Sequence, residues 1–150
     1  MESIIKGILC SSLLADGRIT KQQHAFIIKH STTTNQLEST YDWTISLNNR
    51  TPVDALYIDF SKAFDSVVHS KHTHKLRQIG LPDLLISWIT AFLNDRSQQV
   101  RTENVISHMS KVISSVLQGS ILGPILFIIY VNDLEDFFSN KATLSYLPMI

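Results

Sequence analysis

The chain has 150 residues, 44% of them hydrophobic and 17% charged, so it can bury a core and is not a disordered tail. Thirteen basic and thirteen acidic residues leave no net charge, which removes the strongly basic composition typical of an autonomous nucleic-acid-binding domain. The single cysteine, Cys10, excludes an intrachain disulfide and a multi-cysteine zinc site, and it favours a reducing, intracellular compartment.

Two apolar stretches are candidates for membrane insertion, and the sequence favours neither. The run from Ile121 to Val131 is shorter than the roughly 20 residues that a spanning helix needs, and it contains Gly123 and Pro124. The stretch from Ile4 to Leu14 is interrupted by polar residues and is not followed by a small-residue cleavage site. We therefore expect an intracellular chain without a membrane segment or secretory leader.

In the first half of the chain, hydrophobic periodicity and turn residues predict two helices and a strand. A helix is expected over residues 2–14, and a second one, capped by Ser31 and Thr32, is expected to reach Asn48 with Leu37, Tyr41 and Ile45 on one face. The β-branched and aromatic residues from Val53 to Phe60 are apolar on both faces, which predicts a buried, central strand.

The second half predicts helices around a β-hairpin, giving an α+β order overall. The expected elements are a helix over residues 70–79 that stops at Gly80, a helix opened by Pro82, a hairpin over 96–115, a long helix from Leu122 to about Phe138, and a last strand over 142–146. We expect this last strand to pair with the strand from Val53 to Phe60.

Asp59 is the first candidate for chemistry. It ends an apolar strand, where an unpaired carboxylate is costly and usually has a metal or a cation beside it. Asp65 follows six residues later, and a strand-end acid beside a turn can present an oxygen ligand to Mg²⁺. Alternatively, Asp59 caps the following turn and Asp65 is solvated. The spacing alone leaves both interpretations open.

The second candidate is the turn that begins at Gln118 and ends at Pro124. A polar side chain, two glycines and a helix start can present free backbone N–H groups to an anion. An ordinary strand-to-helix turn, in which Gly119 and Gly123 relieve packing, explains the same pattern and is favoured by the pattern alone.

Three histidines and an aromatic pair receive simpler interpretations. His69, His72 and His74 lack a neighbouring cysteine or acidic ligand, so we interpret them as a solvated helix start. Trp88 and Phe92 lie at helical spacing and are interpreted as core residues.

Two long motifs carry a resemblance to a known family. The stretch from Tyr57 to Val67, with His69 shortly after it, closely resembles the first catalytic block of reverse transcriptases of non-LTR (LINE-type) retrotransposons. The stretches 117–127 and 130–134 resemble the second block, and Gln23 to Phe26 with the following Ser-Thr pair resembles the finger segment. The resemblance implies a right-hand polymerase palm over residues 51–150, a partial fingers segment over about residues 1–50, and a missing thumb.

The resemblance also implies roles for individual residues. Asp59 would bind the two Mg²⁺ ions, with the Phe60 backbone carbonyl close to one of them, and Phe64 would exclude a ribose 2′-OH. Gln118 and Gly119 would line the site of the incoming nucleotide. The implied partners are an RNA template, a DNA primer and a deoxynucleoside triphosphate.

The sequence departs from the family pattern at several positions. Ile27 stands where the finger block usually has an arginine that contacts the triphosphate, and Ser115 and Leu117 stand where glycine and proline are usual. The third block, Tyr-Ala-Asp-Asp, is expected near Tyr146, but residues 147–150 contain no acid. We therefore expect a truncated and inactive polymerase fragment, with a frameshift after Tyr146 as the hypothesis for the lost acids.

Two other function classes remain open on the sequence. One is a non-catalytic remnant that binds RNA or protein, which the neutral net charge disfavours for RNA. The other is an unrelated Mg²⁺-dependent phosphotransferase that uses Asp59 and Asp65.

Overall fold

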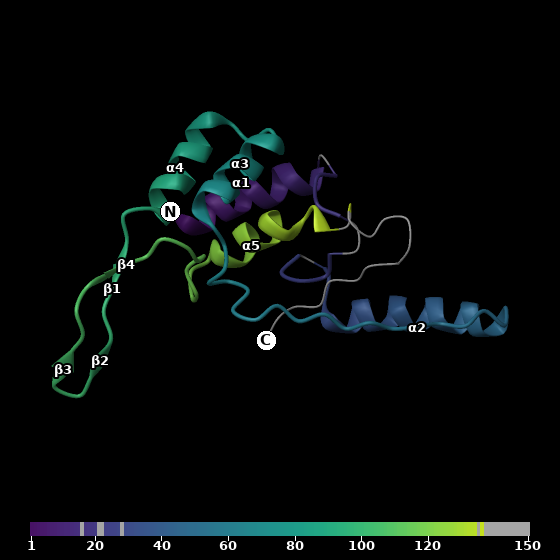
Figure 1. Ribbon diagram of the computed structural model, residues 1–150. Coiled ribbons are helices and arrows are strands. Elements are labelled where there is room, and N and C mark those ends of the chain that lie inside the picture. The colour runs from purple at the N-terminus through teal and green to yellow at the C-terminus, as the bar shows by residue number, and fades with distance from the viewer. Residues whose placement is uncertain (16, 21–22, 28, 135, 137–150) are drawn as a thin grey trace. The chain divides into compact units, whose positions relative to one another are not determined.

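The computed structural model describes residues 1–15, 17–20, 23–27, 29–134 and 136, and it divides into two compact units (Figure 1). Unit 1 holds residues 1 and 3–61 together with the described residues from Val131 on, and unit 2 holds residues 2 and 62–130. The mixture of helices and antiparallel strand pairs confirms the predicted α+β composition. The boundary between a fingers segment and a palm near residue 50 stays a prediction. Among the described residues, no helix is long and apolar enough to cross a bilayer.

The first helix, α1 (Glu2–Ala15), confirms the helix predicted over residues 2–14. Leu9, Cys10 and Leu13 are buried among its described side chains, whereas Ile4 and Ile8 are exposed. Burial raises the pKa of the Cys10 thiol, so this cysteine is an apolar core residue and not a reactive thiolate.

Helix α2 (Thr32–Asn48) begins where the sequence predicts, because Ser31 caps it. Ser31 Oγ accepts from the Thr34 N–H at 3.2 Å, and Thr34 Oγ1 accepts from the Ser31 N–H at 2.9 Å, which forms a reciprocal capping box. The buried imidazole of His24 lies 3.0 Å from Thr34 Oγ1 and 3.1 Å from Glu38 Oε2. The Glu38 carboxylate can only accept, so His24 Nε2 donates to it, and the contacts with Thr34 and Glu38 tie residues 23–27 to α2.

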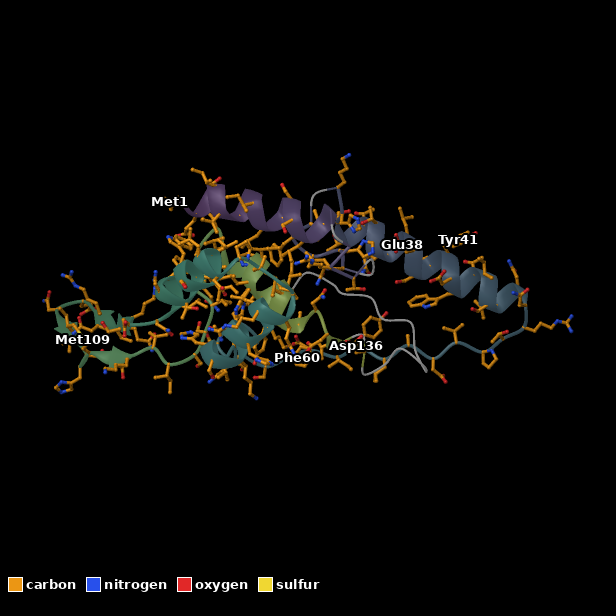
Figure 2. The ribbon with its side chains drawn as sticks, turned by 90° about the horizontal axis from the view of Figure 1, so that it is seen from above. Met1, Glu38, Tyr41, Phe60, Met109 and Asp136 are labelled. Carbon is orange, nitrogen blue, oxygen red and sulfur yellow. The ribbon has the colours of Figure 1, made fainter. Side chains whose placement is uncertain are left out.

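The apolar residues of α2 are solvent-facing. Leu37 and Tyr41 are 65% and 67% exposed, and Figure 2 shows Glu38 and Tyr41 on this helix. Asn35 is its one buried residue among those described. The amphipathic pattern therefore predicted the helix correctly, but this face has no core to cover within the described part of unit 1.

The predicted strand from Val53 to Phe60 is wrong for the described structure. Residues 51–60 have no regular secondary structure and every one of them is exposed, with Leu56 at 83%. A segment that is apolar on both faces needs a neighbour on each side to become a central strand. No strand pairs with it among the described residues, and the expected partner at 142–146 lies outside them.

Asn132 links two distant parts of unit 1. Its Oδ1 accepts from the Thr20 N–H at 3.1 Å, and its Nδ2 donates to the Arg18 carbonyl at 2.8 Å. The amide thus replaces the donor and acceptor that a neighbouring strand would supply to residues 18–20.

Unit 2 is built on α3 (His69–Gln78), α4 (Asp83–Leu93) and α5 (Gly123–Val131) (Figure 1). Helix α3 packs against α4, and the turn between them uses Gly80 at φ +69°, where a glycine is favoured. Pro82 is the cap of α4 and not its first helical residue. Helix α5 ends at Val131, before the predicted end near Phe138, which lies outside the described residues.

The core of unit 2 is almost entirely aliphatic. Its members that are less than 2% exposed, apart from His72, are Val67, Leu76, Ile89, Leu93, Val116, Leu122, Ile125, Leu126 and Ile128. Trp88 and Phe92 are half-buried and stack on each other at 5.6 Å between ring centroids, so the prediction that they are core residues is only partly right.

The predicted hairpin is present and contains a bulge. Strand β1 (Ser97–Gln98) pairs with β4 (Ser110–Lys111), and β2 (Arg101–Thr102) pairs with β3 (Val105–Ile106), both antiparallel. Two residues separate β1 from β2, but three separate β3 from β4, so the strand around Met109 carries one extra residue. Such a bulge interrupts the ladder and locally increases the strand twist. Glu103 at φ +48° makes the turn (Figure 1).

Candidate functional site

The turn from Lys62 to Val68 opens unit 2. Lys62 adopts φ +52°, and both the N–H and the hydroxyl of Ser66 donate to its carbonyl at 2.9 Å. This turn places the half-buried ring of Phe64 against Phe127 of α5, with ring centroids 4.7 Å apart. Phe64 is therefore held by the core of unit 2 and is not a freely rotating surface side chain.

A short antiparallel contact joins this turn to residues 114–116. The Val116 N–H donates to the Phe64 carbonyl at 3.0 Å, and the Ser115 N–H donates to the Val67 carbonyl at 2.9 Å. The side chain of His69 adds a bond from Nε2 to the Ser115 carbonyl at 2.8 Å. These bonds fix the main chain of the first motif relative to the main chain just before Gln118.

Ser115 is a strained residue at the centre of this contact. Its φ of +103° lies in the region that favours glycine, the residue usual at this place in the motif. The Ser115 hydroxyl has one proton, and its oxygen lies 2.9 Å from the Val116 carbonyl and 3.4 Å from Asp65 Oδ1. The closer acceptor is the Val116 carbonyl, so the link to Asp65 is the weaker of the two.

A groove of about 370 Å³ lies beside this contact within unit 2. Gln118 lines it together with Asp65, Arg96, Ser97, Gln98 and Ser115, and with the apolar side chains of Leu93, Val112 and Leu117. Arg96 is positioned by a 2.8 Å bond from Nε to the Phe92 carbonyl, and its guanidinium carbon lies 4.8 Å from the centre of the Phe92 ring. The groove thus presents an amide, a cation and a carboxylate to solvent.

The turn from Leu117 to Gly123 is closed by its own hydrogen bonds. Ser120 Oγ donates to the Leu117 carbonyl at 2.9 Å and accepts from the Gly123 N–H at 2.8 Å, and the Ser120 N–H also donates to Leu117 at 3.3 Å. Gly123 is required by packing, because an added Cβ would lie 2.5 Å from the Leu117 carbonyl oxygen. The interpretation that glycines relieve packing in this turn is therefore confirmed for Gly123 and wrong for Gly119, where no described atom lies within 4 Å of an added Cβ. The N–H groups of Ser120 and Gly123 are not free for an anion.

The remaining predicted site residues lie in unit 1. Asp59 and Phe60 belong to the exposed segment without regular structure, where Phe60 is 48% exposed (Figure 2). Phe64, Gln118 and Gly119, which adopts φ +80°, belong to unit 2. The predicted site is thus divided between the two units.

Residues 2–147 match the protein family described as reverse transcriptase (RNA-dependent DNA polymerase). The chain belongs to the reverse transcriptase family. It is 27% identical over 135 residues to the RNA-directed DNA polymerase from mobile element jockey of Drosophila melanogaster, covering 89% of this chain and 14% of that protein. It is 29% identical over 136 residues to the probable RNA-directed DNA polymerase from transposon X-element of the same species, covering 90% of this chain and 15% of that protein.

These relatives confirm the predicted resemblance to non-LTR retrotransposon enzymes. The chain spans about one seventh of the length of the curated relatives that it matches. No solved structure matches it significantly.

The described residues of this reverse transcriptase chain do not assemble a metal site. Among them, no three histidine, cysteine or acidic side chains lie close enough together to hold a metal ion. Mg²⁺ prefers about six oxygen ligands in near-octahedral geometry, and the exposed segment around Asp59 provides no such set.

The interpretation of the histidines as a solvated helix start is wrong for two of them. His69 and His72 are 8% and 0% exposed, whereas His74 is exposed. His72 Nε2 lies 2.8 Å from the Leu126 carbonyl, and its buried Nδ1 has no hydrogen-bond partner among the residues that the structure describes. The missed indication was the spacing of His69, His72 and Leu76, which places all three on one face of α3.

The surroundings of His72 determine its protonation. Burial lowers the pKa of His72 to about 4, opposed by the bond to Leu126 and reinforced by the charges of His69 and Lys75. At neutral pH, His72 is therefore an uncharged donor to α5.

At Ile27, where the family motif has arginine, the side chain is 8% exposed, so this position carries a core residue and not a phosphate contact.

Proposed function

We propose that this chain contributes the nucleotide-binding part of an RNA-directed DNA polymerase palm and that the 150-residue chain alone does not polymerise. The family match over residues 2–147 supports the polymerase assignment. The observation that carries the second part is the absence of any acid in the sequence from Tyr146 to Ile150, where the third motif is expected. In the proposal, the natural partners of the complete polymerase are an RNA template, a DNA primer, deoxynucleoside triphosphates and a divalent metal.

The groove in unit 2 is the proposed nucleotide site. Gln118 lines it, as the motif implies, and Arg96 supplies a positive charge toward a triphosphate. Phe64, fixed against Phe127, is proposed to contact the sugar. Asp59 is proposed as a metal-binding acid of the complete enzyme, with the Phe60 carbonyl beside it.

The lack of polymerisation follows from electrostatics. Nucleotidyl transfer develops negative charge that metal ligands and cations stabilise by several kcal/mol each, and about 1.4 kcal/mol corresponds to tenfold in rate. Without the paired acids and the finger arginine, the rate of the isolated chain is expected to fall below detection.

Primer extension tests this part of the proposal. The chain is incubated with a DNA primer on an RNA template, deoxynucleoside triphosphates and Mg²⁺ or Mn²⁺, and no template-dependent incorporation is expected. Incorporation that disappears in the Asp59→Ala variant would contradict the proposal.

Nucleotide binding tests the groove separately. Trp88 stacks on Phe92, whose ring also lies beneath Arg96, so its fluorescence reports on this region once Trp43→Phe has removed the other tryptophan. We expect dGTP to change the Trp88 emission in a saturable way, and Arg96→Ala to weaken binding about tenfold or more, as loss of a charge-assisted contact does. Exposed Arg77 on α3 provides the matched control, Arg77→Ala. Salt-dependent RNA binding without dGTP binding would instead identify a non-catalytic RNA-binding remnant.

A further inference from the structure

We infer that His69 is a positioning residue for the nucleotide groove, because its imidazole fixes the Ser115 peptide and thereby holds the Phe64 turn and the Gln118 turn in one register. This inference rests on the proposed function for its consequence in nucleotide selection. Its structural part concerns unit 2 alone.

The direction of the key hydrogen bond is settled by its partner. The Ser115 carbonyl oxygen can only accept, so His69 Nε2, 2.8 Å away, carries the proton and donates. His69 is the first residue of α3 and is 8% exposed, so the bond is largely shielded from water. A shielded bond is costly to leave unmade.

Ser115 needs this donor because of its backbone conformation. The local pairing uses the N–H groups of Ser115 and Val116, which donate to Val67 and Phe64. At φ +103°, Ser115 is in a conformation that a non-glycine residue keeps only when its surroundings enforce it. The His69 imidazole donates a hydrogen bond to the carbonyl of Ser115, and this bond opposes relaxation of the strained peptide.

The consequence reaches the groove through the chain. Ser115 lines the groove, and Gln118 follows three residues later in the same wall. The Val116 bond to the Phe64 carbonyl ties the turn that carries Asp65, another residue lining the groove, to the same peptide. Release of the Ser115 carbonyl is expected to loosen the spacing between Phe64 and Gln118, and so to reduce the preference for a deoxyribose over a ribose nucleotide.

Three variants separate positioning from folding. His69→Ala removes the donor, and His69→Gln keeps an N–H donor at about the position of Nε2. His74→Ala removes an exposed histidine from the same helix and serves as the matched control. Thermal unfolding of each variant establishes that it is folded.

Hydrogen exchange of the Ser115 and Val116 amides is the first readout, because both amides are donors in the contact. In His69→Ala, we expect these two amides to exchange about tenfold faster, as the loss of one shielded hydrogen bond implies. The amides within α4 and α5 are expected to keep their rates. In His69→Gln and His74→Ala, all of these rates are expected to stay within about twofold of the parent chain. Unchanged Ser115 and Val116 exchange in a folded His69→Ala chain would overturn the inference.

The second readout is the ratio of the dissociation constants of GTP and dGTP, measured by Trp88 fluorescence in the Trp43→Phe background. We expect His69→Ala to lower this ratio by about fivefold or more and His69→Gln to restore it. If the parent chain and His69→Ala both bind dGTP and have the same ratio of GTP to dGTP dissociation constants, the nucleotide part of the inference is overturned. A parent chain that binds no dGTP would overturn the proposed function, and the exchange rates would then decide the role of His69 by themselves.

Discussion

The first motif of this reverse transcriptase chain falls into two halves that behave differently. Residues 57–61 are exposed and have no regular structure, whereas residues 62–67 form a hydrogen-bonded turn whose main chain pairs with residues 114–116. Both halves closely match the family motif, so the match itself does not determine which half forms hydrogen-bonded structure. The second half has its pairing partner within unit 2, supplied by the hairpin that returns the chain to residue 114.

The contrast shows that apolar character predicts burial only where a partner exists. Ile58 and Leu56 are as hydrophobic as Ile128 and Leu126, yet the first two are 55% and 83% exposed and the last two are 1% and 0% exposed. Burial of apolar area stabilises a fold by about 25 cal/mol per Å², so only the second pair contributes to the stability of the described fold.

The largest expected effect comes from one substitution made in each region. Leu126→Ala removes a fully buried side chain from α5 and is expected to lower the free energy of unfolding of unit 2 by about 2–5 kcal/mol. Leu56→Ala is expected to change the free energy of unfolding of unit 1 by less than about 0.5 kcal/mol. Urea unfolding measures the first effect by Trp88 fluorescence in a Trp43→Phe background and the second by Trp43 fluorescence in a Trp88→Phe background. A loss of more than about 2 kcal/mol in Leu56→Ala would show that residues 53–60 are packed in solution.

The next largest effect is the pH dependence of the stability of unit 2, which arises from the buried His72. His72 has a pKa of about 4 in the fold against 6.5 when solvated, so it binds fewer protons in the folded state than in the unfolded state between these values. The free energy of unfolding is therefore highest above pH 6.5 and falls as the pH drops toward 4, by roughly 3 kcal/mol at about 1.4 kcal/mol per pKa unit.

The groups that face His72 are His69 and Lys75 on α3 and Tyr130 on α5. His72→Leu is expected to flatten the pH dependence, and His74→Ala is expected to leave it unchanged. Urea titrations at pH 7.5 and pH 4.5 with the Trp88 reporter measure the difference. Equal pH dependence in the parent chain and in His72→Leu would refute the assignment to His72.

A smaller effect concerns the region of unit 1 that does have a partner. Asn132→Ala removes both bonds to residues 18–20 and is expected to lower the unfolding free energy of unit 1 by about 1–3 kcal/mol. Asn132→Asp keeps the acceptor for the Thr20 N–H but places a carboxylate oxygen against the Arg18 carbonyl oxygen, so it is expected to lose more than Asn132→Ala. Trp43 fluorescence in a Trp88→Phe background reports the unfolding of unit 1. Identical losses in the two variants would contradict the separate roles given to the two amide atoms.

The smallest effect is a difference between two substitutions at Ser115. Ser115→Gly loses the hydroxyl but relieves the positive φ, whereas Ser115→Ala loses the hydroxyl and keeps the strain. We expect the glycine variant to be more stable than the alanine variant by about 1 kcal/mol, measured with the Trp88 reporter. The reverse order would show that Ser115 leaves the positive-φ region in solution.

Elements with local determinants were predictable from the sequence. The Ser31 cap fixes the start of α2, and the alternation around Asn104 predicts the hairpin, since both depend on residues close in the chain. The bulge near Met109 was not predictable, because no particular residue type marks one extra residue in a strand. The exposure of residues 53–60 was missed because their apolar pattern indicates that a strand there needs neighbouring strands. The pattern does not indicate whether those strands are present.

The site was predictable in part for the same reason. The motif singled out Gln118, which lines the groove, but gave no indication of Arg96, whose place depends on the Phe92 carbonyl and ring. The roles of Asp59, Phe60, Phe64, Gln118 and Gly119 stay predictions. His72 is buried against Leu126 of α5 and His69 bonds to the Ser115 carbonyl. Both partners are more than forty residues away in the chain, and only the helix face that the two histidines share indicated their burial.

The close approach at Gly123 affects how variation in this motif is to be interpreted. With the Leu117 carbonyl oxygen 2.5 Å from the place of a Cβ, every side chain is excluded, alanine included, whatever the protein is selected for. Intolerance at position 123 therefore carries no information about nucleotides. Around Gly119, no atom of the described part of the chain lies within 4 Å of an added Cβ, so the restriction there comes from its φ of +80°. Asparagine adopts such a φ more readily than most residues. A chain that folds with asparagine at position 119 but has lost nucleotide binding would locate the ligand at that backbone, which makes position 119 the informative glycine of the pair.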